Sequence, residues 1–451
     1  MPKPRIRTVE GSCWGCKERR VICDLNTPTC DKCATAGRHC DYGKVRLRWT
    51  DCVASRGRLA GKKIPLYRPP TLQKNRDQYM LYFEAEVLPR FTIANNVLRV
   101  DLENLSRDPI LLHSVVAVAN AHQTYRNTAA PDPSSALSKL KDRNGAIKMF
   151  RKNLSDAHNS TEVNNSLFLA NVLLCILDGI IEPSTKETPT HHHLLGGKAI
   201  LSQWGGAQEI LSMKHELPVL FLSIFATMDL THAVLIGDRP FFEPSSWAEL
   251  SNRDSWWGNV ASDDDYLETM AIFAQLANLG HETLHVQSTI PIGTLLSIQM
   301  ALEQQAYRRA DLPDGDNPET ASWSAFCSVY RFSASIYLYR ALSGLPIGHL
   351  LVQQSVSSCV DVIASPTLSL KHHHCILFPL LIVAAHCLLD SQRVVVQKSL
   401  AQTASFLSFE SLRSLKAFLE QLWTKLDRDP ATLELSWWDL FNDIASVTCL
   451  F

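Results

Sequence analysis

Six cysteines lie close together near the N-terminus of this 451-residue chain. They are Cys13, Cys16, Cys23, Cys30, Cys33 and Cys40, with the spacing C-x2-C-x6-C-x6-C-x2-C-x6-C. The half-motif C-x2-C-x6-C therefore occurs twice in succession. Thiolates bind divalent zinc, and a closed structural zinc site takes four ligands in a tetrahedron. The chemistry that this spacing predicts is metal binding.

The number of metal ions follows from the number of sulfurs. Six thiolates fill one four-ligand site with two left over, or fill two sites when two sulfurs each bridge both metals. The internal repeat favours two ions. A disulfide framework is the alternative for a dense cysteine array, but the first ten residues, MPKPRIRTVE, contain no apolar export signal. We therefore expect two zinc ions per chain.

Charge is distributed as unevenly as cysteine. The formal net charge of the whole chain is -1, yet residues 1–68 carry a net +10 and the remaining residues a net -11. Zinc-bound thiolates contribute about -2, so the N-terminal segment keeps a net charge of about +8. A basic arm on an acidic body is typical of a protein that binds nucleic acid. The longest apolar run, residues 375–389, is shorter than the roughly 20 residues of a membrane-spanning helix, so we expect no membrane partner.

Residues 11–43, GSCWGCKERRVICDLNTPTCDKCATAGRHCDYG, resemble the fungal binuclear zinc-cluster transcription factors. The resemblance implies that Cys13 and Cys30 bridge the two zinc ions. The family pattern of basic residues after the second cysteine, a central proline and a late glycine is met by Lys17, Arg19, Arg20, Pro28 and Gly37. The family usually has lysine before the third cysteine, where this chain has Ile22.

The basic residues predict how such a module contacts DNA. Residues 17–22 lack glycine and proline, so we expect a short helix that presents Lys17, Arg19 and Arg20 to the bases in the major groove. We expect Lys32 and Arg38 to contact phosphates. The resemblance implies CGG-like triplets as the target. The alternative is a zinc module that contacts protein.

The remaining chain contains the elements that position or regulate this module. We predict a zinc-cluster module at residues 1–45, a basic linker at 46–70 without a coiled-coil heptad, and an all-α domain at 71–451. The fold class is therefore mainly α. If the protein forms a homodimer, the sequence shows no evident coiled coil through which the two chains would pair. Asp108 and Pro109 are typical of a helix start, and Trp323, Phe326, Tyr330, Ala334, Tyr337 and Ala341 recur at helical spacing.

The large domain resembles the fungal-specific regulatory domain in stretches such as YMLYFEAEVLPRF and HHHCILFPLLIVAAHC. The resemblance implies a domain that relays signals to the transcription machinery. Residues 434–446 either activate transcription or form a packed terminal helix with Trp437, Leu440, Phe441 and Ile444 inward. We expect the histidines of 191–193 and 372–374 to be partly exposed at helix starts.

A competing motif lies at residues 281–285, where His281, Glu282 and His285 match the H-E-x-x-H of zinc peptidases. The extended form of that motif fails at Ser288 and Pro291, and Glu303 is a conceivable third ligand. The alternative function is thus a zinc hydrolase. The favoured hypothesis is a non-enzymatic, nuclear, zinc-dependent transcription factor that binds double-stranded DNA by sequence and regulates RNA polymerase II genes. The resemblance extends this to metabolic or secondary-metabolite gene clusters.

Overall fold

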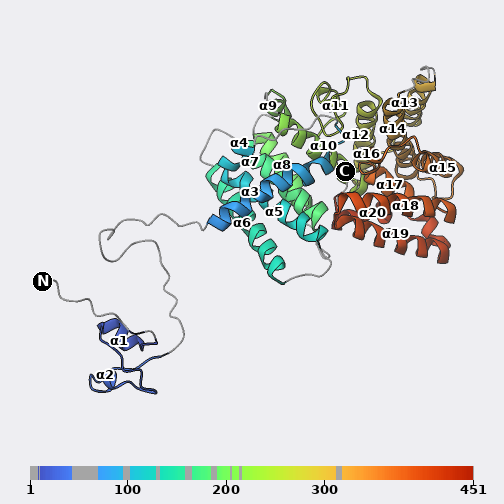
Figure 1. The fold of residues 1–451 in the computed structure, drawn as a ribbon. Helices are drawn as coiled ribbons and strands as arrows, with labels where there is room; N and C mark the ends of the chain where they lie inside the picture. Colours follow the sequence, from blue (N-terminus) through green and yellow to red (C-terminus); the bar gives the residue numbers. More distant parts are fainter. Residues whose placement is uncertain are drawn as a thin grey trace. The chain divides into compact units, whose positions relative to one another are not determined.

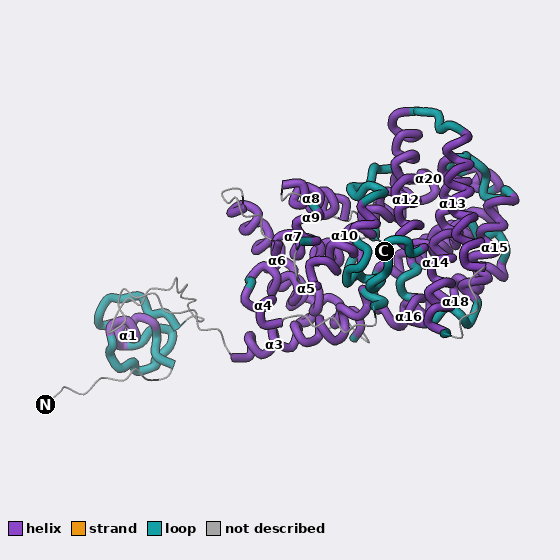
Figure 2. Tube along the Cα trace, turned by 90° about the horizontal axis from the view of Figure 1, so that it is seen from above, coloured by secondary structure: helices purple, strands orange, loops and turns teal. Residues whose placement is uncertain are grey.

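The computed structural model describes residues 9, 11–42, 70–94, 102–127, 133–157, 165–183, 190–203, 206–212, 216–310 and 317–449. The chain divides into two compact units, residues 1–70 and residues 71–451 (Figure 1). The described residues form helices and loops, with one isolated bridge between Ser255 and Gly258 and no strand (Figure 2). Of the predicted linker, residues 46–70, only Pro70 is among the described residues, as the first residue of α3.

The small unit contains two short helices, α1 (Trp14–Arg19) and α2 (Asp31–Ala34). The helices of the large unit follow one another along the chain, with single π or 3-10 turns labelled η. Its first half contains α3 (Pro70–Tyr82), η1 (Phe83–Val87), η2 (Leu88–Phe91), α4 (Leu102–Arg107), α5 (Pro109–Arg126), α6 (Pro133–Ala157), α7 (Asn165–Ile176), η3 (Leu177–Ile181), α8 (Thr190–Gln203), α9 (Ala207–Leu211) and α10 (Glu216–Ile236).

The second half of the large unit ends in three helices that pack side by side, α18, α19 and α20 (Figure 1). Its elements are α11 (Ser246–Glu249), α12 (Asp265–His281), η4 (Glu282–Val286), α13 (Ile292–Ala310), α14 (Pro318–Tyr337), η5 (Leu338–Leu342), α15 (Leu350–Ala364), α16 (Leu370–His373), α17 (Leu377–Ala385), α18 (Asp390–Leu407), α19 (Ser411–Arg428), η6 (Pro430–Glu434) and α20 (Trp437–Val447).

Local signals explain several of these helices. The Asp108 carboxylate accepts a hydrogen bond from the N–H of Ile110 at 3.0 Å, and Pro109 occupies the first turn of α5, as predicted. Phe326, Tyr330 and Tyr337 on α14 are fully buried, which confirms the predicted apolar face. Pro89 lies in the first turn of η2, a 3-10 turn that follows η1 directly. Proline fits the first turn of a helix, where its missing N–H leaves no hydrogen bond unmade.

Helix α10 is the central apolar helix of the large unit. Its segment Leu217–Ile236 has a mean hydropathy of 1.9 and is long enough to cross a membrane, yet 94% of the apolar window is buried. It packs against α7, α12 and α20, as a core helix does. The segment Leu217–Ile236 is longer than the apolar run noted at residues 375–389, although Asp229 interrupts it in the sequence. The Asp229 side chain is buried, and its carboxylate lies 2.7 Å from the Lys198 ammonium.

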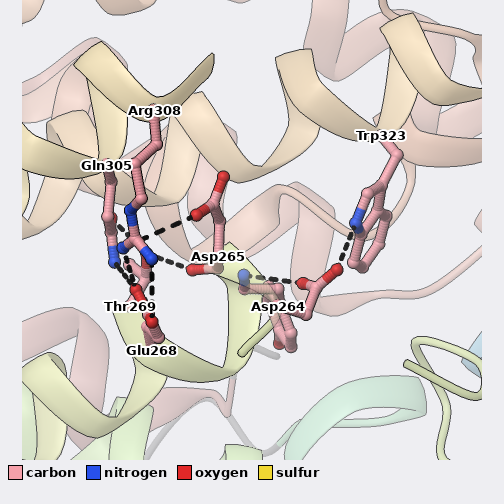
Figure 3. A network of polar contacts seen from close by, with 8 residues as sticks. Asp264, Asp265, Glu268, Thr269, Gln305, Arg308 and Trp323 are labelled. Atoms are coloured by element: carbon pink, nitrogen blue, oxygen red, sulfur yellow. Dashed lines mark hydrogen bonds and ion pairs between the residues drawn. The ribbon is translucent and has the colours of Figure 1, made fainter. Parts of the chain in front are cut away.

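A polar network fixes the start of α12 (Figure 3). The Asp264 carboxylate accepts the N–H of Tyr266 at 2.8 Å and the indole N–H of Trp323 at 3.0 Å, which joins α12 to α14. Thr269 donates to the side chain of Gln305 at 3.1 Å, which joins α12 to α13. The first turn of α12 is therefore tied to both neighbouring helices.

The C-terminal segment is a packed helix. Trp437, Leu440, Phe441 and Ile444 on α20 are each at most 3% exposed, which confirms the inward face predicted for this helix. The Trp437 indole donates to the carbonyl oxygen of Val234 on α10 at 3.0 Å. Helix α20 is therefore part of the core.

The two histidine tracts have different environments. His191 and His192 are exposed and His193 is partly buried at the start of α8, as expected. The expectation is wrong for residues 372–374, which are all at least nine-tenths buried. Hydroxyl groups compensate for the burial of two of them, since a ring nitrogen of His372 lies 2.6 Å from the Ser322 hydroxyl and one of His373 lies 3.4 Å from the Ser399 hydroxyl. Burial lowers the pKa of His372 to about 4, so the ring is neutral at pH 7.

Candidate metal centre and nucleic-acid interface

Two copies of one backbone motif position the six cysteines. Cys13 and Cys30 each precede a short helix, and the N–H of Lys17 and the N–H of Ala34 donate back to their carbonyl oxygens at 3.0 and 2.9 Å. The chain then passes through the left-handed region at Arg20 (φ 58°) in the first copy and Gly37 (φ 57°) in the second. The cysteine repeat is therefore also a structural repeat with an offset of 17 residues.

The sulfur atoms lie at zinc-ligand spacing. Cys13 Sγ is 3.6 Å from Cys30 Sγ and 3.5 Å from Cys33 Sγ, while Cys16 Sγ is 3.5 Å from Cys30 Sγ. A zinc–sulfur bond of about 2.3 Å gives a tetrahedron whose edges are about 3.8 Å long. A disulfide requires about 2.05 Å between sulfurs, and all six thiols are free. The residues present therefore fit zinc.

The sulfurs form two tetrads that share two members. One tetrad comprises Cys13, Cys16, Cys23 and Cys30, and the other comprises Cys13, Cys30, Cys33 and Cys40. The candidate ligand atoms of each tetrad lie within 4.8 Å of one another. Five of the six side chains are buried, and Cys40 is partly buried. The shared pair is Cys13 and Cys30, the pair that the resemblance implies as bridging ligands.

N–H groups directed at the sulfurs favour the thiolate form. The Cys16 N–H donates to Cys13 Sγ at 3.4 Å, and the Cys30 N–H donates to Cys40 Sγ at 3.3 Å. Burial by itself raises the pKa of the Cys30 thiol, but hydrogen bonds from the Cys33 backbone and the neighbouring thiols outweigh it and lower that pKa to about 6. A thiol with this pKa is largely ionised at pH 7, as metal binding requires. Burial raises the pKa of Cys13, Cys16 and Cys33, so zinc binding must displace the protons of these thiols.

Comparison with known proteins agrees with this geometry. Residues 11–49 match the fungal Zn(2)-Cys(6) binuclear cluster domain, and residues 78–450 match the fungal specific transcription factor domain. The chain belongs to the fungal zinc-cluster transcription factors. The cluster domain of this family binds two zinc ions. The hydrolase alternative finds no support in either match.

A curated relative of this transcription factor is the thiamine biosynthesis regulatory protein of Saccharomyces cerevisiae. The two sequences are 26% identical over 173 residues, which is 36% of each chain. The match thus spans little more than a third of that relative's length.

The predicted base-reading helix differs from the observed one. Helix α1 begins at Trp14, where Cys13 supplies the cap, and ends at Arg19, so residues 20–22 are not helical. The Arg20 side chain is exposed at the end of α1. Ile22 follows two residues later and is 55% exposed. The end of α1 therefore presents the Arg20 cation and the apolar Ile22 side chain to solvent, next to the exposed Arg19.

The other predicted DNA contacts fall into two groups. Arg19 turns back to the cluster, where its guanidinium donates to the Lys32 carbonyl oxygen at 2.7 Å and to Cys33 Sγ at 3.5 Å. The Lys17 ammonium lies 4.8 Å from the centre of the Trp14 ring. The side chains of Lys32 and Arg38 are exposed on the second half of the repeat.

Two residues that support the cluster were not predicted from the sequence. The Tyr42 hydroxyl lies 3.4 Å from Cys23 Sγ and donates to the Asn26 carbonyl oxygen at 3.0 Å. A Cβ atom at Gly15 would lie 2.9 Å from Cys33 Sγ, so only glycine fits between α1 and the sulfurs. An aromatic residue two positions after the last cysteine, and a glycine inside the first C-x2-C, are the signals that could have indicated them.

Proposed function

We propose that this transcription factor binds double-stranded DNA with two segments that have different tasks. The folded cluster, residues 11–42, has five basic and four acidic residues. Two zinc ions bound to six thiolates add about -2, so the folded cluster is close to neutral. Residues 43–68 have eight basic residues and one acidic residue. The basic segment therefore supplies most of the attraction to phosphates, and the cluster supplies the sequence preference.

The observation that carries this proposal is the exposed Arg20 beside a fixed sulfur cluster. Cys13, Cys16, Cys23, Cys30, Cys33 and Cys40 hold two zinc ions, which supply covalent cross-links to a segment too small for a hydrophobic core of its own. The cross-linked backbone fixes the end of α1. Arg20 then donates to guanine O6 and N7 in a CGG-like triplet. Lys17 supports it from α1, and Lys32 and Arg38 contact phosphates.

The large unit, residues 71–451, passes regulatory signals to the transcription machinery, and the protein acts in the nucleus. We place residues 1–45 in the DNA-binding module and 46–70 in the linker. The name of the yeast relative supports metabolic genes as targets. A homodimer would form through surfaces other than a coiled coil.

The dependence of DNA affinity on salt concentration tests whether the basic segment supplies most of the attraction to phosphates. We expect the full chain to bind duplex DNA with a log-log salt slope near -4 to -5, as neutralisation of ~5 phosphates gives. Changing Lys44, Lys62 and Lys63 to Gln should move the slope toward zero by up to about 2.7 and leave the preference for one triplet unchanged. The matched control changes the exposed Lys398, Lys416 and Lys425 of the large unit to Gln. Salt-independent binding, or equal effects of the two triple variants, would contradict the proposal.

A further inference from the structure

Two histidines and one carboxylate meet at the C-terminal end of α12. His281 is the last residue of α12, His285 lies in the π turn η4, and Asp238 follows the end of α10. Their candidate ligand atoms lie within 4.8 Å of one another. Asp238 and His281 are partly buried and His285 is exposed. The H-E-x-x-H segment thus acquires a third potential ligand, Asp238, that the sequence does not indicate.

The backbone holds Asp238 in place. Helix α10 ends at Ile236 and is followed by Gly237, whose φ of +79° lies in the left-handed region. The N–H groups of Gly237 and Asp238 both donate to the Ala233 carbonyl oxygen, at 2.9 and 3.2 Å, in the manner of a glycine-capped helix end. A Cβ atom at Gly237 would lie 2.5 Å from the Leu284 side chain. The Asp238 loop and the histidine turn are therefore in close contact.

A backbone contact determines which nitrogen of His281 can bind a metal ion. The Nδ1 atom of His281 lies 3.2 Å from the Gly237 carbonyl oxygen, which can only accept, so Nδ1 carries the proton and Nε2 presents its lone pair. Metal-binding histidines commonly donate their second ring N–H to a carbonyl oxygen in this way. The rings of His281 and His285 have their centres 4.6 Å apart. Because His285 is exposed, its side chain can rotate until a ring nitrogen reaches an ion that the other two groups hold.

We propose that Asp238, His281 and His285 form a third metal site, which takes an exchangeable transition-metal dication. Two imidazoles and one carboxylate suit Zn²⁺, Ni²⁺ or Cu²⁺ rather than Mg²⁺ or Ca²⁺. Three protein ligands at a solvent-exposed position leave coordination positions open to water. The ion would join the end of α10 to η4, next to Trp438 of α20, whose ring lies 3.3 Å from a Cβ position at Gly237. The regulatory unit would thereby respond to free metal.

The same geometry separates this site from a peptidase centre. The Glu282 carboxylate, which would activate water in a peptidase, lies 3.6 Å from the Arg239 guanidinium. Glu303 lies on α13 and accepts a hydrogen bond from Gln299 at 2.9 Å. The site is therefore assigned a binding role, and it is independent of the proposed DNA contacts.

Zinc titration of the full chain tests the site. Protein that already holds two zinc ions should bind one further equivalent of Zn²⁺ in competition with a zinc-sensitive dye. The affinity for this third zinc ion should fall in each of three variants, Asp238→Asn, His281→Ala and His285→Gln. Each loss should exceed the roughly 10- to 100-fold that removal of an outer-shell partner costs. The controls are His192→Ala, an exposed histidine on α8, and Glu282→Ala, next to the ligands. Both should keep the third equivalent.

A second measurement identifies the ligands without relying on affinity. Cu²⁺ added to zinc-loaded protein should give an electron paramagnetic resonance spectrum with nitrogen couplings that are lost in His285→Gln. This exposed position can change without affecting the core, and circular dichroism checks each variant for native helix content. Absence of a third equivalent, or a third equivalent that all three ligand variants retain, would overturn the proposal. DNA binding by the cluster is unaffected by either result, so the two proposals fail separately.

Discussion

Replacing Arg20 by glycine should separate DNA recognition from folding of the cluster. Arg20 has φ 58° and ψ 39°, and Gly37 occupies the equivalent position of the second half-repeat with φ 57°. A left-handed backbone costs a non-glycine residue about 1–2 kcal/mol, whereas the freedom of glycine in the unfolded chain costs about 0.5–1 kcal/mol. The two terms nearly cancel. Arg20→Gly should therefore change the stability of the cluster by less than about 1 kcal/mol and retain two zinc ions.

The effect on DNA binding should be much larger. A bidentate contact between arginine and guanine contributes about 1–3 kcal/mol of discrimination between bases, which is roughly 5- to 150-fold in affinity at 25 °C. The loss should appear on a duplex that carries a CGG triplet. On a duplex with a scrambled triplet Arg20 supplies one charge near the phosphates, so the loss there should be small.

Fluorescence anisotropy at fixed salt measures both affinities, and zinc analysis of the same samples counts the metal. Arg38→Ala is the matched control, because loss of a phosphate contact should weaken both duplexes alike. The reasoning is refuted if Arg20→Gly retains two zinc ions while its ratio of affinities for the CGG duplex and the scrambled duplex stays within about twofold of the wild-type ratio.

Three further predictions concern other residues. Arg19→Ala removes the hydrogen bonds to Cys33 Sγ and the Lys32 carbonyl oxygen, so a chelator should extract zinc faster and DNA binding should fall in parallel; unchanged extraction would contradict this role. Ile22→Lys adds a cation at a 55% exposed position, so the salt slope should steepen by about 1, and an unchanged slope would count against proximity to phosphates. The third concerns His386, which is fully buried and accepts a hydrogen bond from the Arg340 N–H. Burial lowers the pKa of His386 to about 3, so the ring is neutral in the folded protein. Because its pKa in the unfolded chain is about 6.5, stability should fall as pH drops below 6.5, by about 1.4 kcal/mol at pH 5.5, and His386→Leu should reduce the pH dependence of Tm.

The parts of the structure that were predictable from sequence depend on local signals. The spacing of six cysteines determined the expected zinc cluster because ligand geometry allows few arrangements of four sulfurs around each ion. The Asp108–Pro109 pair predicted the start of α5 for a similar reason, since the cap interacts only with the following turn. The inward face of α20 followed from helical periodicity.

Other features depend on residues that are distant in the sequence. Arg19 contacts Lys32 and Cys33, which are brought near by the second half-repeat, so its inward orientation has no signal in the basic run itself. The burial of His372 and His373 depends on the hydroxyls of Ser322 on α14 and Ser399 on α18. Asp238 lies more than 40 residues before His281 in the sequence and reaches it only through the packing of α10 against α12.

The difference between the two halves of the cluster also favours the first half as the reading half. The backbone of each half passes through the left-handed region at the same point, and the second half has glycine there, which adopts this conformation without strain. The first half has Arg20, so the strain is retained although glycine fits the same fold. Backbone strain of this kind is found at functional sites, where the side chain is needed for binding rather than for stability. Arg19 is also exposed, but its guanidinium donates to Cys33 Sγ and the Lys32 carbonyl oxygen, and Ile22 carries no charge. Sequence preference should therefore depend on Arg20 more than on any other residue of residues 11–42.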